Sequence, residues 1–188
     1  MAVLPIRTVP DPILRKKTKR VSTIDKSVKK LIADMLETLH AEEGRAGLAA
    51  PQVGVSLRIT VIGVPDMEDI VLINGEIVRR KGERVISEGC LSVPGYVAEI
   101  KRAEKVTAKG LDANGKEVRI KGEGLLAQAL EHELDHLDGV LYIDKMEKDT
   151  LRKLTPEDTA ADTDDEQSED ASQEDVEAKA DTKSKAAK

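Results

Sequence analysis

Apolar side chains recur with a helical period between residues 25 and 44. The positions that form this stripe are Val28, Leu31, Ile32, Met35, Leu36 and Leu39. Their spacing places them on one side of a helix, and the remaining positions are polar. Asp25 is suited to cap the start of this helix and Gly44 to end it. We therefore expect a long amphipathic helix in the N-terminal part of the chain.

A second helical pattern covers residues 123–139 and contains the sequence HELDH at 132–136. Its apolar positions are Leu125, Leu126, Ala129, Leu130, Leu134 and Leu137. They form a broad apolar face, so this helix should be largely buried. Gly139 follows the last apolar position and is suited to end the helix.

Patterns typical of β-structure lie between the two helical segments. Residues 57–64 and 69–78 are rich in β-branched side chains and are bounded by Gly and Pro. Residues 104–124 form two alternating runs around Asn114-Gly115, a pair suited to a tight turn with positive φ, and so predict a hairpin. Near the N-terminus, Asp11-Pro12 indicates a turn or the first turn of a helix.

The composition limits the core and the compartment. The chain has no Phe or Trp and only two Tyr, so its core must be aliphatic. The single cysteine, Cys90, excludes an intrachain disulfide and fits a reducing compartment. No apolar run approaches the ~20 residues of a membrane span, and the N-terminal sequence lacks the features of a secretory signal. We expect a soluble, cytoplasmic protein.

The charge is unevenly distributed along the chain. Twelve acidic residues and four lysines lie in residues 155–188, which gives a net charge of −8. The rest of the chain holds 24 acidic and 26 basic residues, a net of +2 that indicates no nucleic-acid-binding surface. We therefore expect a catalytic domain at 1–150 and an acidic, disordered tail at 151–188. The tail fits either a solvated spacer or an interaction segment.

The HELDH sequence raises the possibility of a metal site. His132 and His136 are one helical turn apart, so both imidazoles can reach one cation. Glu133 projects about 100° around the axis from His132, where it can act as a general base on a water molecule. The alternative is an ordinary polar helix face. Burial favours the metal site, because unpaired polar groups in an apolar helix cost several kcal/mol.

Cys90, in the segment SEGCLSVPG, is the candidate third ligand. A thiolate and two imidazoles form a reasonable tetrahedral set with one open position for water. The alternative for Cys90 is a small buried apolar side chain. His40 lies in no motif, and we interpret it as a surface or boundary residue.

Three segments together resemble peptide deformylases. They are GLAAPQVG at 47–54, EGCLS at 88–92 and HELDH at 132–136, in the order and with gaps typical of that family. The similarity also includes RAEKV at 102–106 and covers roughly residues 3 to 150. It implies an α+β fold in which antiparallel sheets pack around a central metal-binding helix. It also implies an enzyme that removes the formyl group from the N-terminal formyl-methionine of new polypeptides and releases formate.

The resemblance implies roles for individual residues. Cys90, His132 and His136 match the metal ligands, and Glu133 matches the general acid/base. Gln52 and the backbone N–H of Leu91 match the donors that stabilise the oxyanion. The implied metal is Fe²⁺, whereas the donor set alone also suits Zn²⁺, Ni²⁺ or Co²⁺.

The resemblance also implies a substrate site. The strand-like segment with Gly47 and Leu48 would pair with the peptide. The residues implied around the methionine side chain are Ile86, Glu88, Gly89, Leu125 and Ala129. Next to Cys90, Glu88 is expected to be buried and to orient the site. Two positions depart from the family pattern: Arg45 replaces the first glycine of the first motif, and Gln128 stands where an apolar residue is common.

The implied substrates are N-formylated nascent peptides, with the ribosome near its exit tunnel as a candidate partner. Two other functions compete with this interpretation. A zinc peptidase with an HExxH motif would need a third ligand downstream of the helix, where the chain has no histidine. A non-catalytic, metal-stabilised or ribosome-associated module would need neither Glu133 nor Gln52.

Overall fold

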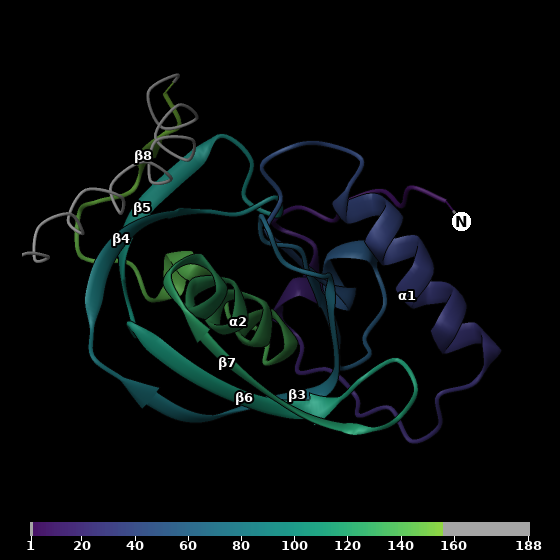
Figure 1. The fold of residues 1–188 in the computed structure, drawn as a ribbon. Helices are drawn as coiled ribbons and strands as arrows, with labels where there is room; N and C mark the ends of the chain where they lie inside the picture. The colour runs from purple at the N-terminus through teal and green to yellow at the C-terminus, as the bar shows by residue number, and fades with distance from the viewer. Residues whose placement is uncertain (1, 156–188) are drawn as a thin grey trace, which may run out of the picture. The chain divides into compact units, whose positions relative to one another are not determined.

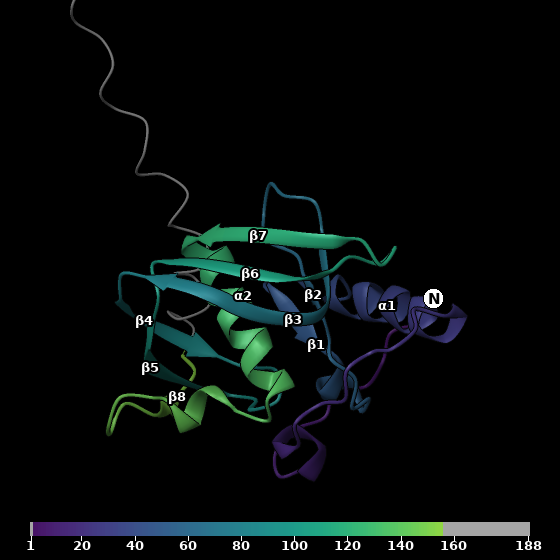
Figure 2. The same cartoon turned by 90° about the horizontal axis from the view of Figure 1, so that it is seen from below.

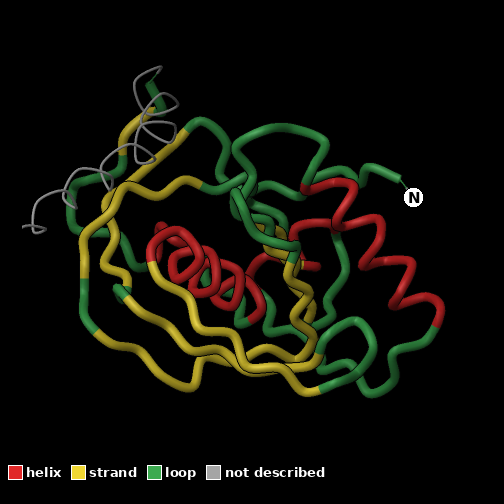
Figure 3. Tube along the Cα trace, viewed as in Figure 1, coloured by secondary structure: helices red, strands yellow, loops and turns green. Residues whose placement is uncertain are grey.

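The computed structural model describes residues 2–155, and the predicted acidic tail falls almost entirely outside the described residues. Within residues 2–155 the chain forms two α-helices, eight strands and three short 3-10 helices (Figures 1 and 3). All strand pairs in its two sheets are antiparallel. The predicted α+β class with antiparallel sheets is therefore confirmed.

Helix α1, Lys26–Leu39, begins as the sequence predicted. The Asp25 carboxylate accepts hydrogen bonds from the first free amides of the helix. Its end differs, because α1 stops at Leu39 and not near Gly44. The Arg45 guanidinium donates to the Thr38 carbonyl in the last turn at 2.6 Å, and the same carbonyl accepts from the Ala41 amide. The N-terminal helix is thus shorter than predicted.

The larger sheet has the strand order β1-β2-β3-β6-β7. Its strands are β1 Gly47–Ala49, β2 Ile59–Ile62, β3 Ile70–Lys81, β6 Lys105–Leu111 and β7 Glu117–Glu123. The strands predicted at 57–64 and 69–78, and the hairpin at 104–124, are therefore confirmed. The hairpin connection is broader than a two-residue turn. Asp112 accepts from the Asn114 and Lys116 amides, and only Gly115 of the predicted turn pair has positive φ, at 83°.

The smaller sheet has the order β4-β5-β8, and the sequence did not predict it. Its strands are β4 Arg84–Gly89, β5 Tyr96–Arg102 and β8 Arg152–Lys153. The 3-10 helices are η1 Pro12–Arg15, η2 Ala50–Val53 and η3 Tyr142–Asp144. Because β8 pairs with β5, regular structure continues past the predicted domain boundary at residue 150.

Helix α2, Gly124–Leu137, lies between the two sheets in both views (Figures 1 and 2). Its buried face packs on the larger sheet, where Leu130 and Leu134 share a core cluster with Leu72 and Val106. A second cluster joins α1 to β1, β2 and β3, and a third lies beside the smaller sheet. The prediction of a buried apolar face fails at Leu125, which is 45% exposed on the first turn of α2.

Candidate metal centre

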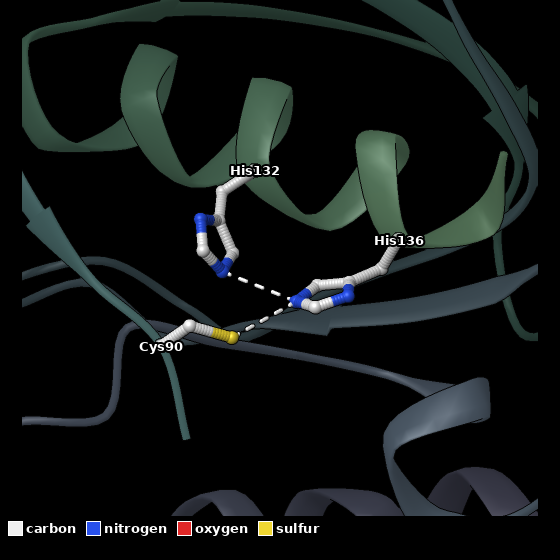
Figure 4. Close-up of side chains that lie close together, drawn as sticks. All are labelled: Cys90, His132 and His136. Carbon is white, nitrogen blue, oxygen red and sulfur yellow. Dashed lines mark hydrogen bonds between the residues drawn. The ribbon is translucent and has the colours of Figure 1, made fainter. Parts of the chain in front are cut away.

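Three potential metal ligands converge on one point between α2 and the end of β4 (Figure 4). The His136 Nε2 atom lies 3.2 Å from both the Cys90 Sγ and the His132 Nε2. The three ligand atoms all lie within 4.8 Å of one another. His132 and His136 come from consecutive turns of α2, while Cys90 directly follows β4. The structure thus brings together residues that are more than 40 positions apart.

The spacing and chemistry of these atoms fit a divalent cation. Ligand atoms at about 2.0–2.3 Å from a tetrahedral ion lie roughly 3.3–3.6 Å apart. Two of the three separations, those of the His136 Nε2 from the Cys90 Sγ and from the His132 Nε2, are 3.2 Å and close to these values. A thiolate and two imidazole nitrogens are also the donor types that transition metals prefer. The residues present therefore fit a metal ion, and Cys90, His132 and His136 could hold it.

His132 is oriented by a buried carboxylate. The His132 Nδ1 lies 2.6 Å from the Glu88 Oε1, so its Nε2 is left to face Cys90 and His136. Arg102 donates two hydrogen bonds to Glu88, at 2.7 and 3.0 Å. Burial raises the pKa of Glu88, but hydrogen bonds from His132 and Arg102 outweigh it and hold that pKa at about 2. Glu88 therefore remains ionised.

Arg102 connects this carboxylate to a second one. Its side chain is 2% exposed, and its Nη1 donates to the Asp135 Oδ2 at 2.7 Å. Asp135 in turn accepts from the Lys145 Nζ at 2.6 Å. Asp135 is not one of the candidate ligands, and through Arg102 it supports the site from outside.

The two histidines have opposite shifts in pKa. Burial lowers the pKa of His132, but the Cys90 thiol and Glu88 outweigh this and raise it well above its ordinary value. Burial and the neighbouring His132 together lower the pKa of His136 well below its ordinary value. Neutral His136 is thus a ready lone-pair donor toward the point where the three groups meet.

Glu133 lies beside the candidate ligands with unused hydrogen-bonding capacity. It is 3% exposed, and its Oε2 has no hydrogen-bond partner among the described residues. Burial raises the pKa of Glu133 to about 7. A carboxyl group with that pKa can both accept and return a proton near neutral pH.

The contact between Glu133 and β1 depends on a glycine. A Cβ atom added at Gly47 would lie 2.5 Å from the Glu133 Oε1. This is far below an ordinary van der Waals contact, so Gly47 leaves the space that the Glu133 carboxylate occupies.

Gln52 lies near Cys90. It is 1% exposed, and its Oε1 accepts from the Ala49 amide at 2.8 Å. Its Nε2 donates to the Ser92 Oγ at 3.3 Å and lies 3.7 Å from the Cys90 Sγ. The Leu91 N–H makes no hydrogen bond with the part of the chain that the structure describes. Both groups can therefore donate to a ligand beside Cys90.

The other predicted site residues lie on the elements around this point. Gly47 and Leu48 belong to β1, an edge strand of the larger sheet, and Leu48 is fully buried. Ile86, Glu88 and Gly89 lie on β4. Ala129 is buried on α2, whereas Leu125 is exposed.

His40, Arg45 and Asp138 lie outside the candidate metal centre. His40 is exposed, as expected, and hydrogen-bonds to Asp69. Arg45 is held at the end of α1, where it also pairs with Glu42. Asp138 pairs with Arg58 away from the metal face.

The sequence patterns predicted no role for Arg102, Ser92 or Tyr142. The Tyr142 ring stacks on the His132 ring at a centroid distance of 6.5 Å, and its hydroxyl donates to the Tyr96 carbonyl. A signal for Arg102 was available: it continues the inward-facing positions of Ala98 and Ile100 along β5. An arginine on a buried strand face requires a carboxylate partner.

No helix among residues 2–155 is both long enough and apolar enough to cross a membrane.

Residues 3–152 match the family model described as Polypeptide deformylase. A protein named peptide deformylase from Dehalococcoides mccartyi strain CBDB1 is 57% identical over 160 residues, which cover 84% of this chain and 95% of the relative. Another of that name, from Halothermothrix orenii, is 52% identical over 147 residues, with 78% of this chain and 95% of the relative covered.

Solved structures give the same result. A crystal structure of a peptide deformylase from Legionella pneumophila aligns with a TM-score of 0.75 at 50% identity, over 78% of this chain and 88% of that one. The peptide deformylase from Synechococcus elongatus, solved in complex with actinonin, aligns with a TM-score of 0.75 at 40% identity. That alignment covers 79% of this chain and 81% of that one.

Proposed function

The chain belongs to the peptide deformylase family, and from this premise we propose which of its residues carry out the family's reaction. The family consists of metal-dependent hydrolases that remove the formyl group from the N-terminal methionine of polypeptides. The observation that carries the residue assignment is the convergence of Cys90, His132 and His136 beside a buried, partly unpaired Glu133.

We assign Cys90, His132 and His136 as the ligands of one divalent ion, which makes α2 the metal-binding helix of the fold. Fe²⁺ is the proposed natural ion, and Zn²⁺, Ni²⁺ or Co²⁺ are possible substitutes for the same donor set. When bound, such an ion lowers the pKa of a water ligand and polarises the formyl carbonyl. The thiolate and the two nitrogens leave one position for solvent or substrate.

Glu133 is the proposed general acid and base. It takes a proton from the attacking water and later delivers it to the amine that leaves as the C–N bond breaks. Three features support this role: its position next to His132 in sequence, its burial and its unpaired Oε2. The products are formate and a free α-amine.

Gln52 and Leu91 are the proposed donors to the oxyanion. The formyl oxygen gains negative charge during attack, and one well-placed donor to it contributes roughly 3–4 kcal/mol. The Gln52 Nε2 lies near the Cys90 sulfur, and the Leu91 amide is free within residues 2–155. Both donors thus come from segments next to the candidate metal ligands.

The substrate backbone is proposed to pair with the free edge of β1 at Gly47 and Leu48. The methionine side chain is assigned to Ile86, Glu88, Gly89, Leu125 and Ala129. Because the Glu88 carboxylate is held by His132 and Arg102, only its aliphatic part is available to substrate. The departure at Arg45 does not alter this assignment, because its guanidinium is held at the end of α1.

The proposed setting follows from the reaction. The substrates are N-formylated nascent peptides, the compartment is the cytoplasm, and the ribosome near its exit tunnel is the proposed site of encounter. We extend the proposed catalytic domain from 1–150 to residue 154, because β8 pairs with β5, and assign the residues after it as an acidic appendage. Neither competing function gains support, because the candidate ligands include none downstream of α2 and because Glu133 and Gln52 both lie at the site.

Formate release from formyl-Met-Ala tests the proposal. Protein purified without oxygen and loaded with Fe²⁺ or Ni²⁺ should release one formate per peptide, and metal analysis should give one ion per chain. Actinonin, which is bound in the Synechococcus elongatus structure, should inhibit the release. Peptide-bond cleavage without formate release would reject the proposal.

A further inference from the structure

An N-terminal segment crosses η2, which carries Gln52, and the loop after β4, which carries Cys90. The Arg7 amide donates to the Gln52 carbonyl at 2.7 Å, and the Val9 amide donates to the Ser92 carbonyl at 2.9 Å. Figure 2 shows this segment in purple, running from the N-terminus beside α1 to η1. The amides of two alternate residues, with Thr8 between them, therefore bridge segments that are about 40 positions apart in the sequence.

Ser92 is held to the candidate metal centre by three groups. Its amide donates to the Cys90 Sγ at 3.4 Å, its hydroxyl accepts from the Gln52 Nε2 at 3.3 Å, and its carbonyl accepts from the Val9 amide. Ser92 is fully buried. A shift of its backbone would therefore be transmitted to the sulfur.

Gln52 is held in the same manner. Its side-chain oxygen accepts from the Ala49 amide, its side-chain nitrogen donates to Ser92, and its carbonyl accepts from the Arg7 amide. The Arg7 amide thus fixes the backbone of Gln52, and the Val9 amide fixes the backbone of Ser92.

The segment contributes through its main chain. The Arg7 side chain is 51% exposed and Val9 is 37% exposed, so neither side chain is packed in the core. The segment is fastened before and after this stretch. The Leu4 amide donates to the Thr38 hydroxyl on α1, and Leu14 is fully buried in the cluster that contains Val93.

We propose that the Arg7 and Val9 amides are positioning groups that set the separation between the Gln52 amide nitrogen and the Cys90 sulfur. This inference rests on the proposed roles of Cys90 as a metal ligand and Gln52 as an oxyanion donor. The Val9 amide acts on the Cys90 side through Ser92, and the Arg7 amide acts on the Gln52 side. Loss of either amide leaves a carbonyl without its partner and frees one loop to shift.

The two amides have different expected effects. Removal of the Arg7 N–H should lower kcat about tenfold and leave KM and metal retention nearly unchanged, because an oxyanion donor acts mainly in the transition state. Removal of the Val9 N–H should accelerate metal loss about tenfold, because support of a ligand from outside changes metal affinity by roughly 10–100-fold.

Ester substitution tests this without a change of side chain. The α-hydroxy acid analogues of arginine and valine are introduced at positions 7 and 9 of the full chain by nonsense suppression, which replaces one N–H by oxygen. The measurements are kcat and KM on formyl-Met-Ala, the rate of Ni²⁺ transfer to a chelator, and the thermal midpoint.

Two matched esters serve as controls. The Thr8 N–H makes no hydrogen bond with the described residues, so an ester at Thr8 should behave as the parent protein. The Val9 ester also makes the Thr8 carbonyl a weaker acceptor, and this carbonyl accepts from the Asp11 amide. An ester at Asp11 removes that hydrogen bond alone and so measures this side effect. The Val9→Ala variant, which keeps the N–H, should retain metal like the parent.

The outcomes separate the inference from the proposed function. If the Arg7 and Val9 esters match the Thr8 ester in kcat and metal retention, the inference is overturned, even when their thermal midpoints fall. Cys90→Ser and Gln52→Ala are measured in parallel. If Cys90→Ser holds Ni²⁺ as the parent does and Gln52→Ala keeps its kcat, the proposed function fails instead, and the inference fails with it.

Discussion

Helices α1 and α2 have the same length of 14 residues but bury different kinds of side chain. The buried face of α1 is largely aliphatic, and its two buried polar residues have partners. Asp34 accepts from Ala2 and Lys30, and the Thr38 hydroxyl accepts from Leu4. The buried face of α2 adds Glu131, Glu133 and His136 to its leucines and alanines.

The difference lies in the unpaired polar atoms of the fully buried residues. Glu131 accepts from Arg80 and from the Ala103 amide, so it is a structural group. The Glu133 Oε2 and the His136 Nδ1 have no hydrogen-bond partner within residues 2–155, and both residues are buried. On α1 the Glu37 Oε2 also lacks a partner, but Glu37 is only half-buried. Buried polar atoms are nearly always hydrogen-bonded, so unpaired ones require an explanation. On α2 the unpaired atoms belong to the proposed reaction, whereas the buried surface of α1 serves stability.

The strongest test of this contrast is Glu133→Gln. The side chain keeps its size but cannot accept the proton from water, so turnover should fall by about 10²–10⁴-fold. Metal content and thermal midpoint should remain near those of the parent. Steady-state formate release and metal analysis on the same preparation provide the measurement. A variant with more than half of the parental kcat would remove Glu133 from its role.

Cys90→Ser tests the ligand set. Replacement of the thiolate by a neutral hydroxyl should weaken metal retention or change the reactivity of the loaded protein, because serine is a poor ligand for these ions. The rate of Ni²⁺ transfer to a chelator, compared with that of the parent, measures the effect. Equal rates and equal formate release would show that Cys90 is not a ligand.

Glu88→Gln tests the support of His132. The amide oxygen can still accept from the imidazole, but the negative charge of Glu88, which interacts with both Arg102 and His132, is lost. Metal affinity or turnover should fall by about 10–100-fold. Stability should also fall, since Arg102 would lose one of its two buried carboxylate partners. Competition with a chelator and thermal unfolding measure both effects. Unchanged metal affinity would exclude a supporting role.

Met35→Ala tests the other helix. Met35 is fully buried on α1, and truncation of such a side chain costs about 2–5 kcal/mol of unfolding free energy. Well below the unfolding transition, kcat/KM should change little, because Met35 lies in the cluster between α1 and the larger sheet. Urea unfolding and formate release measure the two quantities. A selective loss of kcat with unchanged stability would contradict the contrast.

Truncation after Thr155 should have the smallest effect. The proposed catalytic residues and the strand β8 all precede this position. We expect kcat/KM on a short formyl peptide to stay within about twofold of the parent. A large loss of kcat would show that residues 156–188 contribute to catalysis.

Periodic patterns predicted the helices and the strands β2, β3, β6 and β7 of the larger sheet, whereas a strand at β1 was implied only by the family resemblance. α1, α2 and the β6-β7 hairpin each have a clear period and a turn signal at one or both ends. The strands β4 and β5 were not predicted. On β5 a signal was present, because Arg102 lies on the same buried face as Ala98 and Ile100. The predicted end of α1 was also wrong, because no Gly or Pro stands between Leu39, where the helix ends, and Gly44.

The candidate site also contains residues that the sequence indicated and residues that it did not. Cys90, His132 and His136 could be selected by residue type and spacing, and the family resemblance added Gln52 and Leu91. The contacts of Arg102 with Glu88 and Asp135, and those of Ser92 with Val9, join distant segments. Such pairings depend on the fold as a whole, so the sequence alone did not reveal them.

The brevity of β1 has a consequence for solubility. As an edge of the larger sheet it presents unpaired main-chain groups, and such edges promote aggregation between copies of a protein. A strand of three residues offers few main-chain hydrogen bonds to a second copy of the protein, yet it is long enough to pair with a short extended peptide. We expect that a longer β1 would promote self-association of the protein more than it would improve peptide binding.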